Sequence, residues 1–220
     1  DFPFVALLAS GGHTALYRVG GMDRSAVSEL GATRDDAAGE AFDKVAKLLG
    51  LGYPGGPVID RLAREGDPER VSLASPLRSK TSLEFSFSGL KTQVARYVEA
   101  NGRPGNDQRL RDLCAAFQRR VVDTLVGKAL LAARREQVGA LVLAGGVAAN
   151  RELRERAGAA CAEHGIRLFV PPPRACTDNA AMIAYAGAFR LARGEDDRGH
   201  LEISPDTALA RVTRKGAGRR

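Results

Sequence analysis

The sequence contains no tryptophan, and cysteine and histidine each occur only three times in 220 residues. Cys114, Cys161 and Cys176 are odd in number and form no CxxC pair. Neither a disulfide framework nor a zinc knuckle is therefore indicated. We expect a protein of a reducing compartment, the cytoplasm.

Long hydrophobic stretches are also missing. No apolar run approaches the roughly 20 residues that a helix needs to cross a bilayer, and no basic segment followed by an apolar one opens the chain. Nothing indicates a membrane or secreted protein. The chain starts at Asp1 just before an apolar strand and has no initiator Met, so we expect it to be truncated at its N-terminus.

The composition, 44% hydrophobic and 27% charged, is typical of a globular protein with one sizeable core or two small lobes. Lys and Arg number 33 against 26 Asp and Glu, which gives a net charge of +7. This balance fits a polyanionic partner such as RNA, but many arginine-rich proteins are basic without one. Aromatic residues make up only 5%, so any RNA binding should be mainly electrostatic.

The spacing of apolar residues predicts the order of helices and strands. An apolar run at 4–9 and a second strand at 15–19 predict a hairpin, and a helical period from Asp36 to Leu49 ends at Gly50. Next we expect a helix beginning near Pro57, a loop over 66–84 with at most one short strand, and a helix capped by Ser88. A long helix should then cover 110–135. After it we expect a strand at 140–144, a helix over 149–163, a strand at 166–170 and a helix over 179–193. The βαβα order at the end predicts a mostly parallel sheet flanked by helices.

The turn between the first two strands is rich in glycine. Gly11 and Gly12 let backbone come close to a ligand, and the hydroxyls of Ser10 and Thr14 add polar groups beside an anion-binding nest. Hairpins of this kind hold phosphate in the actin, Hsp70 and sugar kinase superfamily. A plain hairpin turn accounts for the same residues.

A second glycine turn follows the strand at 140–144. Gly145 and Gly146 place bare backbone at the carboxyl end of a strand, where α/β sheets bind ligands, and the amide of Asn150 could reach a ribose or ring nitrogen. A tight turn that requires glycine is the structural alternative.

Three acidic residues, Asp36, Glu40 and Asp43, share one side of the helix over 36–49. For Glu40 a solvated helix surface is the favoured reading. Asp43 differs because the turn at 53–57 follows closely and could bring the main chain of Gly56 beside it around a sugar hydroxyl.

The last strand is followed by a proline-rich loop that ends in Asp178. Thr177 or Asp178 would serve as an ordinary helix N-cap, but an aspartate at the mouth of the sheet could also ligate a metal. The three histidines are far apart in sequence and supply no HxxxH pair.

Taken together, these stretches resemble one family. Five blocks occur in its order, namely ASGGHT, DDAAGEAFDKVAKLLGLGYPGGP, FSFSGLKT, LAGGVAANRELR and CTDNAAMIAYAG. The chain is thereby similar to the universal tRNA adenosine threonylcarbamoyltransferase family, TsaD in bacteria, from Phe4 to about Gly187. Two departures are small: Glu84 stands where the family has Asp before FSFSG, and Ala9 stands where Val is common.

The resemblance implies an α/β lobe of the actin-like ATPase superfamily, with the N-terminal lobe largely missing. Residues 4–178 would form the C-terminal nucleotide-binding lobe, 179–193 a helix returning towards the N-terminal lobe, and 194–220 a charged basic tail. The implied reaction moves threonylcarbamoyl from threonylcarbamoyl-AMP to N6 of the adenine 3′ of the anticodon. The implied partners are tRNA, a TsaB paralogue and a TsaE ATPase, with no membrane.

The family's site residues carry over by motif, and no catalytic base is among them. Asp178 is the implied ligand of one divalent metal, Fe²⁺ with Zn²⁺ as the alternative, and the two histidine ligands of an HxxxH motif would precede this chain. The metal site is therefore expected to be incomplete. The implied substrate contacts are Leu8, Ala9, Ser10, Gly11, Gly12, Asp43, Gly56 and Asn150.

Three other functions stay open at this point. The first is a metallopeptidase, suggested by the family's former name of glycoprotease, although HExxH is absent. The second is a small-molecule kinase of the same superfamily. The third is a non-enzymatic tRNA-binding or assembly role.

Overall fold

The structure is a computed structural model, and it describes residues 2–75, 81–195 and 210–211. No helix in these ranges is long and apolar enough to cross a membrane. Most of the basic tail expected over 194–220 lies outside the described residues, and residues 210–211 form a short edge strand.

A mixed sheet forms the base of the fold, and its strand order is β5-β4-β1-β2-β3-β6. β1 pairs antiparallel with β2, and β2 with β3, whereas β4 lies parallel to β1 and β5 parallel to β4. The predicted α/β class is confirmed, and the strands of the βαβα part pair in parallel as expected, while the antiparallel pairs of β1 with β2 and of β2 with β3 make the sheet mixed. The strands are β1 (Phe4–Ala9), β2 (Thr14–Val19), β3 (Val27–Ala32), β4 (Ala140–Ala144), β5 (Arg167–Phe169) and β6 (Ala210–Arg211).

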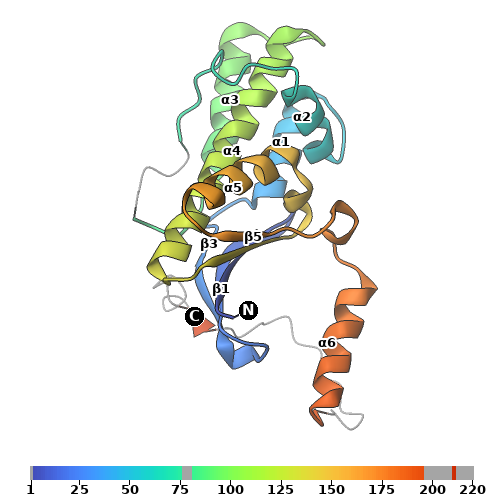
Figure 1. The fold of residues 1–220 in the computed structure, drawn as a ribbon. Helices are drawn as coiled ribbons and strands as arrows, with labels where there is room; N and C mark the ends of the chain where they lie inside the picture. The colour runs from blue at the N-terminus through green and yellow to red at the C-terminus, as the bar shows by residue number, and fades with distance from the viewer. Residues whose placement is uncertain (1, 76–80, 196–209, 212–220) are drawn as a thin grey trace, which may run out of the picture.

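Helices α1 to α5 stack over one face of this sheet, and α6 projects away from the body (Figure 1). The helices are α1 (Ala38–Leu49), α2 (Gly55–Ala63), α3 (Ser88–Asn101), α4 (Gln108–Arg135), α5 (Arg151–Glu163) and α6 (Ala180–Ala192). Three 3₁₀ helices complete the described chain, η1 (Arg24–Ala26), η2 (Gly146–Ala149) and η3 (Pro173–Ala175).

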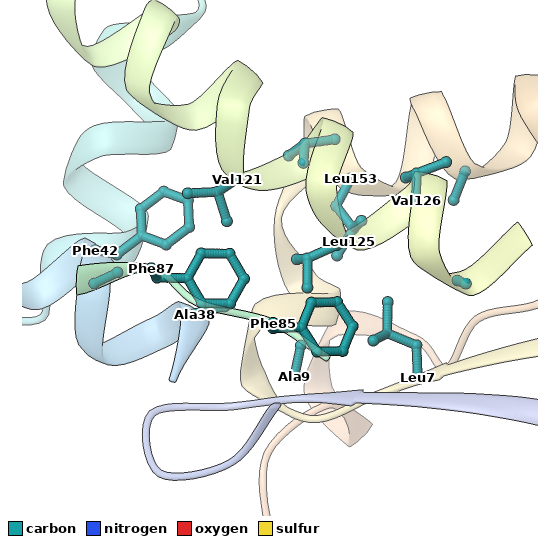
Figure 2. Packing of buried hydrophobic residues seen from close by; sticks show 14 of the residues in the cluster. Leu7, Ala9, Ala38, Phe42, Phe85, Phe87, Val121, Leu125, Val126 and Leu153 are labelled. Atoms are coloured by element: carbon teal, nitrogen blue, oxygen red, sulfur yellow. The ribbon is translucent and has the colours of Figure 1, made fainter. Parts of the chain in front are cut away.

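The core lies between the sheet and the helices. β1 alternates, so Leu7 and Ala9 face the helices and are buried, while Leu8 lies on the less buried face. Figure 2 shows Phe42 and Phe85 over this side of the sheet. The ring of Phe42 meets Phe117 of α4 edge-on at 5.2 Å between centroids, so α1, α4 and the sheet share one apolar core.

The sequence analysis missed β3. Val27–Ala32 includes a serine, a glutamate and Gly31, residues that disfavour strands when judged by propensity alone. Gly31 is required by packing, because a Cβ there would come 2.4 Å from the Leu83 carbonyl oxygen. No strand occurs in the described part of 66–84, and Phe85 instead bridges Thr33.

Two predicted helix caps were wrong. Ser88 is the first residue of α3, and the Asp35 carboxylate accepts from the backbone N–H groups of Phe87 at 2.8 Å and Ser88 at 3.2 Å. At α6, neither Thr177 nor Asp178 is the N-cap; Asn179 accepts from the Met182 N–H. In both places the cap depends on loop geometry that a local sequence signal does not fix.

Candidate functional site

A cavity of about 360 Å³ opens between α1, α2, η2 and the β1–β2 turn. Its lining includes Gly11, Asp43, Gly56 and Asn150, which come from four separate parts of the sequence. The fold therefore gathers four of the eight predicted substrate contacts around one cavity. Leu8, Ala9, Ser10 and Gly12 belong to the adjoining hairpin and do not line it.

The two hydroxyls of the hairpin turn accept hydrogen bonds from the protein's own backbone. The Ser10 Oγ accepts from the His13 N–H at 3.0 Å, and the buried Thr14 Oγ1 accepts from the Ala38 N–H at 2.8 Å. These hydroxyls thus shape the turn and the start of α1, and Thr14 is not the open polar group that the sequence analysis suggested. Gly11 and Gly12 have open space where a side chain would stand, which leaves their backbone accessible.

Two other glycines let the backbone segments approach one another. At Gly39 a Cβ would lie 2.7 Å from the Ser10 carbonyl oxygen, and the Gly39 N–H donates to that oxygen at 3.0 Å. Gly145 has a φ of +87°, and a Cβ there would lie 2.3 Å from the Ala9 carbonyl oxygen. The structural reading left open for the Gly145 turn is therefore correct, and it places η2 against the hairpin.

Asp43 connects α1 to α2. Its Oδ1 accepts from the Gly55 N–H at 2.8 Å and so caps the start of α2. At Gly55 a Cβ would meet the Ala46 Cβ at 2.6 Å, whereas at Gly56 no heavy atom lies within 4 Å. The predicted proximity of Asp43 and Gly56 is confirmed, and Gly56 presents bare backbone to the cavity.

The other two acidic residues of the predicted helix over 36–49 pair with Lys44, and Asp36 precedes α1 rather than lying on it. The Lys44 ammonium lies 2.9 Å from Glu40 Oε1 and 2.6 Å from Asp36 Oδ1. A hydrogen bond from Lys44 lowers the pKa of Glu40 and outweighs the opposing effect of burial. The helix-surface reading of Glu40 is confirmed.

A buried amide network supports the wall that carries Asn150. The Asn150 Oδ1 accepts from the Leu153 N–H at 2.9 Å and caps α5, while its Nδ2 donates to Gln118 Oε1 at 2.7 Å. Gln118, only 1% exposed, donates from Nε2 to Asp60 Oδ1 at 3.2 Å and to Glu152 Oε2 at 3.0 Å. Because two carboxylates fix the Gln118 amino group, its oxygen must face Asn150.

The sequence analysis missed three polar residues of this wall: Gln118, Asp60 and Arg64. Asp60 and Arg64 line the cavity and form an ion pair at 2.9 Å. One signal was available, because Gln118 interrupts the apolar side of the helix between Phe117 and Val121. The cavity thus combines carboxylates, one guanidinium and bare glycine backbone, a set that suits hydroxyls and an anionic group together.

Asp178 belongs to no cluster of metal-binding side chains in the described part of the chain. It is exposed, and in the described ranges no three His, Cys, Asp or Glu side chains gather to hold a metal ion. Its loop lies beside the cavity, since the Thr177 methyl would be 3.9 Å from a Cβ at Gly146. Arg154 ties this loop to η2 by donating to the carbonyl oxygens of Ala148 and Pro171, each at 2.6 Å. The described residues alone do not form a metal site.

Comparison with known proteins fits this arrangement. The family model for tRNA N6-adenosine threonylcarbamoyltransferase, TsaD, matches residues 1–185. The chain belongs to this family. A protein of that name from Sorangium cellulosum is 65% identical over 224 residues, covering 100% of this chain and 62% of the relative. Another from Geobacter metallireducens is 58% identical over 196 residues, covering 89% of this chain and 57% of the relative.

The chain spans about 60% of the length of the curated TsaD relatives that it matches. Among solved structures it is similar to the activator of 2-hydroxyisocaproyl-CoA dehydratase from Clostridium difficile with bound ADPNP. That similarity has a TM-score of 0.48 and 15% identity, over 92% of this chain and 65% of the other. The relatives carry the transferase name, and none of those cited carries the peptidase or kinase name.

Proposed function

We propose that this chain is the nucleotide-binding part of an enzyme that transfers threonylcarbamoyl from threonylcarbamoyl-AMP to N6 of the adenine 3′ of the anticodon in tRNAs reading ANN codons. One observation carries the proposal. Gly11, Asp43, Gly56 and Asn150, which come from three different sequence blocks of the family, line a single cavity. Packing does not explain the glycine at position 56, because no heavy atom lies within 4 Å of the place where its Cβ would stand.

In the proposed complex the cavity holds the adenylate. Oδ1 of Asp43 is already used by the Gly55 N–H, so Oδ2 is the oxygen that would accept from a ribose hydroxyl. The open backbone at Gly11 supplies N–H groups towards an anionic or carbonyl oxygen. Asn150, held by Gln118, offers its remaining amide hydrogen to the substrate.

The proposed reaction is an acyl-type transfer. The adenine amine attacks the carbamoyl carbon, the bond from that carbon to the phosphate oxygen breaks, AMP leaves, and one amine proton passes to solvent. The chain's contribution is binding and orientation of the adenylate beside the incoming base. No protein nucleophile takes part.

The metal and the partners belong to the same proposal. Asp178 supplies one ligand for Fe²⁺, with Zn²⁺ as the alternative, and the remaining ligands would come from outside the described residues. A single carboxylate does not hold a transition metal tightly against water. We further propose tRNA, a TsaB paralogue and a TsaE ATPase as partners, in the cytoplasm.

Single-turnover transfer tests the proposal in the complete product of the gene that encodes this chain. Asp43→Ala, Asn150→Ala and Asp178→Ala should each slow the modification of tRNA by purified threonylcarbamoyl-AMP about tenfold or more. Asp43→Asn and Asn150→Ser serve as controls, because both retain an acceptor for the helix caps at α2 and α5. Normal transfer by all three alanine variants would refute the proposed site.

Binding of tRNA is the second part of the test. Because the chain carries a net charge of +7 and few aromatics, its affinity for tRNA should fall steeply with salt. A dissociation constant that changes less than about threefold between about 50 and 200 mM salt would show that phosphate contacts do not dominate.

A further inference from the structure

A second cavity, of about 410 Å³, lies against the C-terminal half of α4 and shares no residue with the cavity described above. Most of the residues that line it have polar or charged side chains. They include Ser82, Asp123, Thr124, Lys128, Arg134 and His164. On α4, Gln118 supports the wall of the first cavity through its hydrogen bond with Asn150. Lys128 follows ten positions later, about 15 Å along the helix.

Lys128 is a buried cation that has no carboxylate ion-pair partner among the described residues. Its residue is only 7% exposed, and its ammonium donates to the Ser82 carbonyl oxygen at 2.7 Å and lies 6.0 Å from the centre of the Phe85 ring. Among the described residues, no acidic side chain lies within ion-pair distance of it. A neutral carbonyl does not balance a buried charge, so an anion would be favourable here.

The neighbours of Lys128 are mostly positive. Burial is the largest effect that lowers the pKa of Lys128. The charges of Arg34 and Arg135 lower this pKa further, and the charge of Glu84 opposes them. Glu84 is itself paired with Arg34. The local excess of positive charge therefore favours an added anion.

The other ionisable residues of the cavity wall are also consistent with a bound anion. The Arg134 guanidinium lies 2.6 Å from His164 Nε2, and because arginine only donates, this ring nitrogen accepts. Asp123, the acidic residue of the wall, is paired with Arg156 at 2.5 Å. Arg156 in turn keeps its buried Nε without an acceptor in the described structure. The wall thus carries two cations, Lys128 and Arg134, while its acidic residue is already paired.

We propose that Lys128 and Arg134 form a binding site for a phosphate group in this second cavity. The ligand is either a backbone phosphate of RNA or a free phosphate-bearing molecule, since both present the same anionic oxygens. A backbone phosphate would give the protein a second contact with tRNA, remote from the adenylate. The assignment to an RNA backbone phosphate rests on the proposed function, whereas the assignment to a free phosphate-bearing molecule does not.

Inorganic phosphate and tRNA are the two probes. Binding of phosphate, followed by ³¹P NMR, should weaken about tenfold in Lys128→Met and in Arg134→Gln, because each loses a charge-assisted hydrogen bond. Lys47→Met removes an exposed lysine of α1 and should change nothing. Added phosphate should also raise the pKa of Lys128 in the unaltered chain, whereas a purely structural lysine would show no such response.

The tRNA arm identifies the source of the phosphate. If RNA is the ligand, Lys128→Met should reduce the slope of log affinity against log salt by about 1. A loss confined to inorganic phosphate assigns the cavity to a free phosphate-bearing molecule. Unchanged binding of both probes in both variants overturns the proposal.

Two controls separate this site from the adenylate cavity and from misfolding. Asp43→Ala should leave phosphate binding at Lys128 intact, and Lys128→Met should leave adenylate binding intact, so either proposal can fail alone. Lys128→Arg retains the charge and should bind phosphate within about threefold of the unaltered chain. Should Lys128→Met unfold, the exposed Arg134→Gln decides the question.

Discussion

The adjacent glycines Gly55 and Gly56 should respond in opposite ways to the same substitution. At Gly55 an added Cβ would stand 2.6 Å from the Ala46 Cβ and 2.7 Å from the Phe42 carbonyl oxygen, and neither backbone segment can move freely. Gly55→Ala should therefore cost about 1–3 kcal/mol of unfolding free energy. Gly56→Ala meets no atom within 4 Å and should be neutral or stabilising by up to about 1 kcal/mol, because alanine loses less entropy in a helix.

A larger side chain at Gly56 converts the same site into a test of binding. Gly56→Leu would project into the cavity of about 360 Å³ without disturbing the contact between α1 and α2. Urea unfolding should show near-normal stability, while calorimetry with a stable adenylate analogue should show affinity reduced more than about tenfold. Unimpaired binding by Gly56→Leu would mean that the adenylate lies elsewhere, and a fully stable Gly55→Ala would refute the packing argument.

Three further predictions concern stability and reactivity. Partial burial opposes ionisation of Asp35, but hydrogen bonds from two serine hydroxyls and two backbone N–H groups outweigh it and lower its pKa. The ionised Asp35 carboxylate thus stabilises the folded protein at pH values above its unfolded pKa of about 3.9, and this stabilisation is lost as pH falls through the lower folded pKa. Asp35→Ala should lower the free energy of unfolding, measured in urea, by about 0.5–2 kcal/mol at neutral pH and by less in acid. Burial raises the pKa of the Cys114 thiol to about 12, so a thiol reagent should modify it only in unfolded protein, and rapid native labelling would contradict its burial. Gln118→Leu should cost about 1–3 kcal/mol and weaken adenylate binding, because Asp60 and Asn150 lose a buried partner; an unchanged melting temperature would contradict the network.

Much of the fold was predictable because its main elements are long and regularly patterned. The expected strand at 140–144 matches β4, and the expected helix over 110–135 differs from α4 by two residues at its start. Gly50, expected to stop α1, has a φ of +69°. In each case apolar spacing and a glycine signal agree with the tertiary packing, so local and global preferences coincide.

The missed features arise from contacts between distant residues. β3 contains Gly31 because the Leu83 backbone lies against it, and α3 is capped by Asp35, 53 positions before Ser88. The same holds for the site. Motifs located Asp43, Gly56 and Asn150, but the Gln118 network joins α4 to α2 and α5 and has no local pattern. Lys128 has no sequence signal either, because its burial results from tertiary packing.

The most direct test of the central claim is the stoichiometry of the reaction itself. The complete product of the gene would be incubated with threonylcarbamoyl-AMP and tRNA, and both the released nucleotide and the digested tRNA would be measured by mass spectrometry. We expect one AMP for each threonylcarbamoylated adenosine, and the loss of both products in Asp43→Ala. Release of a phosphorylated metabolite or of peptide fragments, without modified adenosine, would contradict the proposed reaction.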